Sequence, residues 1–382
     1  MGRAWIVFLC WLIAACASAP QALPDRQGLF EDHYFAPQSI DERPDVFTVS
    51  AAMKAYLAAQ VSHRLGWHEK AVRLTQLLRG EGELKLVYDA GQTRTAAQAF
   101  ADRAGNCLSL VIMTGALARE LDLGVRYYRV VVADVWSRDG DLLLANQHVN
   151  LSIENQAIHR SPGDEKFSLT VDFLPPEELR GQIRSEIGEN TIVAMFLNNR
   201  AAEHMVAGRR DQAYWSARAA ILADPAYLPA YNTLGVVYLR ERRLVAAERA
   251  FDLARALEPE NPQVLSNLEH VYRSQGRLAA ADRLAEQLRQ LEPVPPYHYF
   301  LAALAAVRQS DYPTARKLLE RELRREPYNH EFLFALALVQ LNLGDLRESR
   351  RYLALARDNS TTMRSREIYQ AKLDRLQVSW PR

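Results

Sequence analysis

Four prolines recur at one fixed distance in the C-terminal half of the chain. Pro225, Pro259, Pro293 and Pro327 are each 34 residues apart. The sequence around them is rich in Ala, Leu, Arg and Tyr and has no strand signals, so each 34-residue unit is predicted to be a pair of helices. A single helix pair cannot bury its apolar face, so the units must stack on one another. The period therefore predicts an all-α solenoid from about residue 190 onward.

The apolar pattern of one unit is clearest after Pro225. Its positions are Tyr231, Leu234, Gly235, Tyr238, Ala247, Phe251, Ala254 and Pro259. This pattern resembles the tetratricopeptide (TPR) repeat. In the same register, units begin near Ala194, Leu228, Pro262, Pro296 and His330. The resemblance implies a TPR array over residues 190–363, a capping helix over 364–382, and a protein or peptide partner bound in the groove of the array.

A second motif, Gly105-Asn106-Cys107, lies upstream of the repeats. Apolar residues recur at helical spacing after Cys107, and Gly105 and Asn106 are common helix-start residues. A thiol at that end lies in the positive field of the helix dipole, which favours the thiolate. His148 follows in a run with strand character, and Asp172 lies in a further strand-like run, 167–173. Cysteine acyl-transfer enzymes use this order of nucleophile, base and acid.

Other residues compete for these roles. His159 is an alternative base and Asp164 an alternative acid, but both lie in predicted loop sequence, where the Pro-Gly turn itself favours an aspartate. A histidine on a strand also commonly has a purely structural role. The oxyanion formed on attack needs two donors. The Cys107 backbone N–H is one candidate, and the side-chain amides of Asn106, Gln92 and Gln98 are candidates for the other.

The region before the repeats combines helices, over about 51–65 and 68–78 and after Cys107, with a predicted antiparallel hairpin from Val125 to Ile153. Helices followed by an antiparallel sheet predict an α+β domain over 46–189. Residues 90–175 resemble the transglutaminase-like core, a branch of the papain-like cysteine proteinase superfamily. The segments that carry the resemblance are AGNCLSLVIMTGALARELDLGVRYYRVVV, NQHVNLSI and LTVDF.

This resemblance implies that Cys107 is the nucleophile, His148 the base and Asp172 the orienting acid. Two features depart from the family pattern. Val149 and Asn150 follow the histidine where many relatives have a small residue and an aromatic one, and the stretch between His148 and Asp172 is longer than in most relatives. Hydrolysis of an amide is the activity that the resemblance favours over cross-linking.

The N-terminus has the pattern of an export signal. Arg3 precedes an apolar run over 4–15, which is too short to span a bilayer. Leu12 to Cys16 then resembles a bacterial lipobox, in which the cysteine is acylated and becomes the first mature residue. A plain signal cut at 17–19 is the alternative. We therefore expect a signal over 1–16, lipid on Cys16, a tether or extended arm over 17–45, and a place at the periplasmic face of the outer membrane.

The count of three cysteines supports a catalytic interpretation of Cys107. Cys10 leaves with the signal and Cys16 is acylated, so one thiol remains in a compartment where cysteines are mostly paired. The alternative is a buried, inert cysteine. With 47 basic and 46 acidic residues, nothing favours nucleic acid as a partner. No phosphate-binding glycine loop occurs, and the spacing of His63 and His68 does not suit a metal site, so no cofactor and no metal are expected.

The sequence thus favours a lipid-anchored cysteine peptidase or amidase with a TPR interaction platform. A non-enzymatic TPR scaffold and a transamidase are the alternatives.

Overall fold

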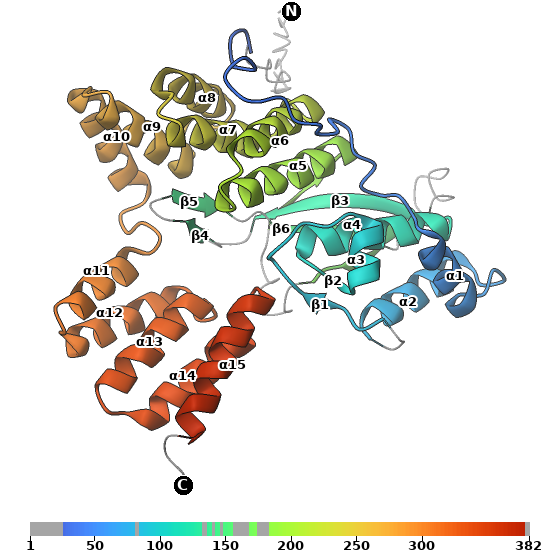
Figure 1. Ribbon diagram of the computed structural model, residues 1–382. Coiled ribbons are helices and arrows are strands. Elements are labelled where there is room, and N and C mark those ends of the chain that lie inside the picture. The colour runs from blue at the N-terminus through green and yellow to red at the C-terminus, as the bar shows by residue number, and fades with distance from the viewer. Residues whose placement is uncertain are drawn as a thin grey trace, which may run out of the picture.

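The computed structural model describes residues 26–80, 84–131, 136–139, 142–145, 148–155, 168–173 and 183–378. Within these residues, an extended N-terminal arm leads into a region of helices and strands, and an array of helix pairs follows (Figure 1). The predicted signal over 1–16, with Cys16, lies outside the described residues, as does the first part of the arm. No helix in the described part of the chain is both long and apolar enough to cross a membrane.

The helix-and-strand region contains short helices and mostly antiparallel strands. Its elements are α1 (Ala51–Gln60), α2 (Trp67–Leu78), β1 (Val87–Tyr88), α3 (Ala96–Asp102), β2 (Ala104–Gly105), α4 (Cys107–Glu120), β3 (Gly124–Val131), β4 (Trp136–Asp139), β5 (Leu142–Ala145), β6 (His148–Glu154), β7 (Ser168–Val171) and β8 (Ile183–Ile187). The main sheet has the strand order β7-β6-β3-β8, and each neighbouring pair is antiparallel. The predicted hairpin is therefore present as β3 and β6, whereas β8 had no counterpart in the sequence analysis.

Strand β6 is fixed in register by its buried residues. Val149, Leu151 and Ile153 are fully buried, and Leu151 lies opposite Tyr127 of β3. Successive side chains of a strand point to opposite faces, so His148 and Asn150 share the other face. A slip of one residue would exchange the two sets, so the apolar residues also fix where His148 points.

Helix α4 is buried along almost its whole length, from Leu108 to Ala118. At Gly115 it comes so close to the sheet that a Cβ atom would overlap the Tyr127 hydroxyl. Arg119, on the last turn of α4, donates to that hydroxyl at 2.9 Å and pairs with Glu189 at the start of the repeats. These contacts hold the helix, and with it Cys107, against the sheet.

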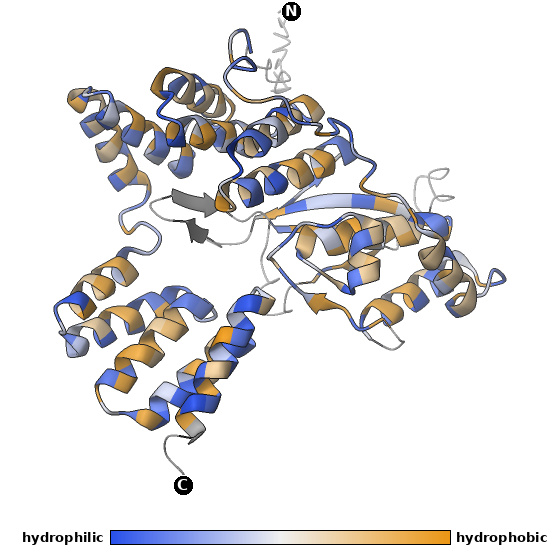
Figure 2. Cartoon of the chain, in the orientation of Figure 1, coloured by the Kyte–Doolittle hydropathy of each residue, from blue (hydrophilic) through white to orange (hydrophobic). Residues whose placement is uncertain are grey.

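The array consists of five helix pairs and a final helix among the described residues. They are α5 (Glu189–Val206), α6 (Arg210–Ala223), α7 (Leu228–Arg240), α8 (Leu244–Leu257), α9 (Pro262–Ser274), α10 (Leu278–Leu291), α11 (His298–Arg308), α12 (Tyr312–Arg325), α13 (His330–Asn342), α14 (Leu346–Asp358) and α15 (Met363–Val378). The 34-residue helical repeat and the capping helix are thus present. Figure 2 shows hydrophobic and hydrophilic residues alternating around the repeat helices, as stacking on one side requires.

Two predicted starts in the array need correction. The first unit begins at Glu189, five residues before the predicted Ala194, because α5 continues back toward β8. The fourth begins at His298 rather than Pro296. Pro295 and Pro296 disfavour the helical conformation at the residues directly before them, 294 and 295. The turn is completed by Tyr297, whose φ of 61° lies in the left-handed region.

The hydrophobic core of the helical array is interrupted at the same place, between α10 and α11. One core cluster runs from Leu29 through α4 and the sheet to Leu284 of α10, whereas the buried residues of α11–α15 form separate clusters. Figure 1 shows the two groups of helices on either side of the linker. We call α5–α10 the first block and α11–α15 the second block.

The described part of the arm, residues 26–47, is bound to the first block rather than hanging free as a tether. Phe35 is buried and stacks on Tyr214 of α6, with ring centroids 3.9 Å apart. Trp215 donates to the Ala36 carbonyl at 2.8 Å. Glu31 accepts two hydrogen bonds from Arg243, at 2.8 and 3.0 Å. An aromatic stack and a bidentate ion pair explain why this proline-rich segment is ordered.

Candidate active site

Cys107 is the first residue of α4 and is the free thiol among the described residues. Asn106 is the N-cap, and its Oδ1 accepts from the Ser109 N–H at 2.9 Å and from the Ser109 hydroxyl at 2.8 Å. The cap sets the direction in which α4 begins. The thiol is half-buried, so it lies at the edge of the core and is not sealed inside it.

His148 and Asp172 come from neighbouring strands. His148 is the first residue of β6, and Asp172 directly follows β7. His148 Nε2 lies 2.7 Å from Asp172 Oδ1, and the two side chains are only 6% and 5% exposed. Cys107 lies close enough to the His148 ring to act on its pKa. The structure therefore brings Cys107, His148 and Asp172 together in that order.

The environment of His148 favours its protonated form. Burial disfavours a charged imidazolium and acts to lower the pKa of His148. The hydrogen bonds and charges of Asp172 and Cys107 act in the opposite direction and outweigh it, so that the pKa of His148 is raised to about 9. Asp172 and Cys107 therefore favour the protonated form of the His148 ring.

Asn150 is part of the same cluster and was missed as a site residue. Its Nδ2 donates to Asp172 Oδ2 at 2.8 Å, and the side chain is buried. The available signal was its position two residues after His148, since alternate residues of a strand share a face. The sequence alone marked Asn150 only as a departure from the family pattern.

The side chain of Asn106, a candidate for the second oxyanion donor, also has a structural role. Its Oδ1 caps Ser109, and its Nδ2 donates to the Thr93 hydroxyl at 2.9 Å. These contacts fix the position of the amide, but its Nδ2 carries two hydrogens, so Asn106 stays a candidate oxyanion donor. Of the other amides, Gln98 accepts from the Thr95 N–H as part of a capping box, and Gln92 is exposed in the preceding loop.

That loop, residues 89–94, connects the site to both blocks of the array. The Thr93 N–H donates to Glu203 of α5 at 2.6 Å. Burial raises the pKa of Glu203, while the hydrogen bonds from Thr93 and the charge of Arg200 act to lower it. The Ala90 N–H donates to the Thr361 carbonyl, between α14 and α15, at 2.7 Å. Segments far apart in the sequence thus meet just before the cysteine helix.

The remaining predictions concern metals and alternative residues. Among the described residues, no group of three His, Cys, Asp or Glu side chains is arranged to hold a metal ion. His159 and Asp164, the alternative base and acid, lie outside the described residues, as does the proposed acylation site Cys16.

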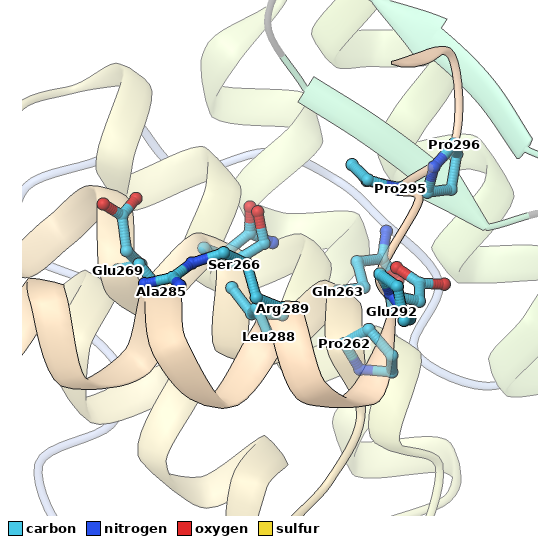
Figure 3. Close-up of a pocket in the computed structure, with 12 residues that line it drawn as sticks. Pro262, Gln263, Ser266, Glu269, Ala285, Leu288, Arg289, Glu292, Pro295 and Pro296 are labelled. Carbon is cyan, nitrogen blue, oxygen red and sulfur yellow. The ribbon is translucent and has the colours of Figure 1, made fainter. Parts of the chain in front are cut away.

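A pocket of about 440 Å³ lies in the array, where the first block ends. Figure 3 shows its walls, which come from α9, α10 and the linker that follows. The lining includes the apolar Leu288 and the charged side chains of Glu269, Arg289 and Glu292. None of the three predicted catalytic residues contributes to it.

No protein-family profile matches the chain, and no curated protein matches its sequence. Among solved structures, the chain is similar to a MamA protein at 17% identity and a TM-score of 0.26, covering 45% of this chain and 93% of MamA. It is similar to yeast Tom70 at 20% identity and a TM-score of 0.34, covering 50% and 41%. For YrrB, described as a TPR protein with an unusual peptide-binding site, the identity is 15%, the TM-score 0.26 and the coverage 47% and 92%. Values this low assign neither a family nor a function to this chain.

Proposed function

We propose that this chain is a protein- or peptide-binding helical-repeat platform that carries a cysteine acyl-transfer site of the transglutaminase-like type. The binding role rests on the stacked helix pairs, a scaffold that presents extended surfaces to partners. The catalytic role rests on one observation, the buried His148–Asp172 pair at 2.7 Å, with Cys107 near enough to help raise the pKa of His148. The substrate is an amide bond, and water is the acceptor.

In the proposed reaction, the Cys107 thiolate attacks the carbonyl carbon of the amide and a carbon–sulfur bond forms. The His148 imidazolium gives its proton to the leaving nitrogen as the carbon–nitrogen bond breaks. Asp172 stabilises the imidazolium and holds its orientation. Water then attacks the thioester and gives a proton to His148, and the acid leaves as the thiolate is restored.

The developing oxyanion needs hydrogen-bond donors. The first N–H groups of a helix have no partner within the helix, so the Cys107 N–H is one donor in this proposal. The side-chain amides of Asn106, Gln92 and Gln98 remain candidates for the second.

We further propose that the chain is a lipoprotein anchored through Cys16 at the periplasmic face of a membrane. Nine residues, a span of ten Cα–Cα steps, separate Cys16 from Arg26, where the described arm begins. An extended chain of that length reaches at most about 35 Å. Because the arm is bound to α6–α8, the first block would then lie within about that distance of the membrane surface.

The first experiment tests catalysis. Purified full-length protein with Cys10 and Cys16 replaced by Ser is treated with iodoacetamide and with p-nitrophenyl acetate, so that Cys107 is the thiol under study. We expect rapid alkylation and a burst of p-nitrophenolate, both abolished by Cys107→Ala without loss of the circular dichroism spectrum. An added amine that captures the acyl group better than water would favour the transamidase instead.

A second function, binding without catalysis, is favoured by the pocket between α9 and α10, which lies outside the cysteine site. If Cys107→Ala leaves every measured activity unchanged, the catalytic proposal fails and the scaffold remains. Partner binding that is lost on Leu288→Glu but retained in Cys107→Ala would support the scaffold directly. The matched control is Val245→Glu on the exposed surface of α8.

A further inference from the structure

The carboxylate of Asp172 is held at both of its oxygens. Oδ1 meets His148 Nε2 at 2.7 Å, and Oδ2 accepts from Asn150 Nδ2 at 2.8 Å. The strand register explains the second contact. Leu151 lies opposite Val171, so the next position places Asn150 opposite Asp172. His148 and Asn150 are two residues apart on β6, so both reach the same carboxylate from one strand.

We propose that Asn150 is a positioning residue of the site, which fixes the plane of the Asp172 carboxylate so that its other oxygen faces His148. A carboxylate held at one oxygen turns about its Cβ–Cγ bond, whereas one held at both oxygens does not. The inference rests on the proposed function, because the position of the Asp172 carboxylate affects the charge and the orientation of the His148 ring that the proposed reaction uses. It adds a fourth residue, in the order Cys107, His148, Asp172, Asn150.

Burial makes the contact specific. The Asp172 side chain is 5% exposed and Asn150 is also 5% exposed, so bulk water does not replace a lost donor. A buried carboxylate oxygen requires a donor, and an amide supplies one without adding a charge beside His148. The Oδ1 of Asn150 is buried and meets no donor among the described residues. Turning the amide over would place this oxygen against the carboxylate, so the orientation of Asn150 is itself fixed.

The chain offers a matched control on the same strand. Ser152 is two residues beyond Asn150 and is 1% exposed. Its hydroxyl lies 3.4 Å from the hydroxyl of Thr170 on the neighbouring strand β7. Ser152→Ala therefore removes a buried cross-strand contact from the same face without touching Asp172. A general weakening of the sheet would affect both variants alike.

The test compares Asn150→Leu with Ser152→Ala in the full-length chain. The protonation of His148 is followed by NMR of selectively labelled histidine, with His148→Gln used to assign the signal. We expect Asn150→Leu to lower the pKa of His148 from about 9 to about 8 or below, and Ser152→Ala to leave it in place. Acylation by p-nitrophenyl acetate should slow about tenfold or more in Asn150→Leu, with KM almost unchanged.

A variant that can donate a hydrogen bond only when protonated separates the positioning effect of residue 150 on Asp172 from the effect of its packing. In Asn150→Asp the introduced carboxyl donates to Asp172 only while it is protonated, so the acylation rate should approach that of wild type at acid pH and fall below it as that carboxyl ionises. If Asn150→Leu does not fold, the pKa of His148 and the acylation rate are measured in Asn150→Ala instead.

An unchanged pKa of His148 in a folded Asn150→Leu variant would overturn the proposal. A raised pKa would do so as well, because Asn150 would then only screen the charge of Asp172. If p-nitrophenyl acetate is not turned over even by the wild type, the proposed catalytic function fails. The NMR comparison still decides whether Asn150 positions Asp172.

Discussion

At the residue scale, the charge of His148 sets the pH range in which the proposed chemistry works. The pKa of His148 is about 9, against an ordinary value near 6.5, despite burial that acts to lower it. The proposed acid is the imidazolium, so amide hydrolysis should decline as pH rises through about 9. The stability that the charged ring contributes is fully present below about 6.5 and is lost as pH rises through about 9.

To test this prediction, the free energy of unfolding is measured for wild type and for His148→Gln at several pH values, and the second is subtracted from the first. This difference should be constant below about pH 6.5 and should fall between there and about pH 9. A difference that stays level across this window, or grows with pH, would contradict the assignment of the charge to His148.

Some residues of the candidate site could be identified from the sequence alone, and others could not. Cys107, His148 and Asp172 were recognisable because each carries chemistry and stands at an element boundary. Asn150 was not, because its role depends on the register of β6 against β7, which a single strand does not specify. The structural role of Asn106, which caps α4 through Oδ1 and donates to Thr93 through Nδ2, also depends on contacts that the sequence does not specify.

At the scale of elements, the start of α4 depends on a close approach at Gly105. A Cβ atom there would lie 2.7 Å from the Cβ of Ser109, the residue that Asn106 caps. Gly105→Ala should therefore shift the first turn of α4 and cost about 1–3 kcal/mol of stability. Alkylation of Cys107 by iodoacetamide should slow by more than the loss of stability explains, because the thiol moves relative to His148.

The control for this prediction is Gly188→Ala at the N-cap of α5, where an added Cβ meets nothing within 4 Å. It should leave both stability and alkylation almost unchanged. Equal effects of the two substitutions, or no effect of Gly105→Ala on alkylation, would show that the first turn of α4 tolerates the shift.

Elements with a strong period were the easiest to predict. The helices that begin at Leu228, Pro262 and His330 stand where the 34-residue register places them. The fourth unit begins at His298, two residues after the position that the register gives, because Tyr297 takes a left-handed conformation that a periodic pattern does not reveal. The arm over 26–47 was ambiguous in sequence, since its order comes from contacts with residues such as Tyr214, about 180 positions away.

At the scale of the whole molecule, the core is divided at the linker between α10 and α11. The first block shares one apolar cluster with α4 and the sheet, whereas α11–α15 have clusters of their own. Packing within each block is tight, and the loop before the cysteine helix reaches the second block through the bond from Ala90 to Thr361. Two bodies with separate cores are expected to unfold separately.

Matched core substitutions test this division. Leu234 of α7 and Leu336 of α13 are both 0% exposed, and truncation of either to Ala should destabilise its own block by about 2–5 kcal/mol. Followed by hydrogen exchange, Leu336→Ala should speed exchange in α11–α15 and leave α4 and the sheet protected. Leu234→Ala should speed exchange in α5–α10 and in α4 together, because these elements share one cluster. If each variant instead loosens both blocks to the same extent, the linker does not divide the molecule, and the second block is part of the unit that holds Cys107.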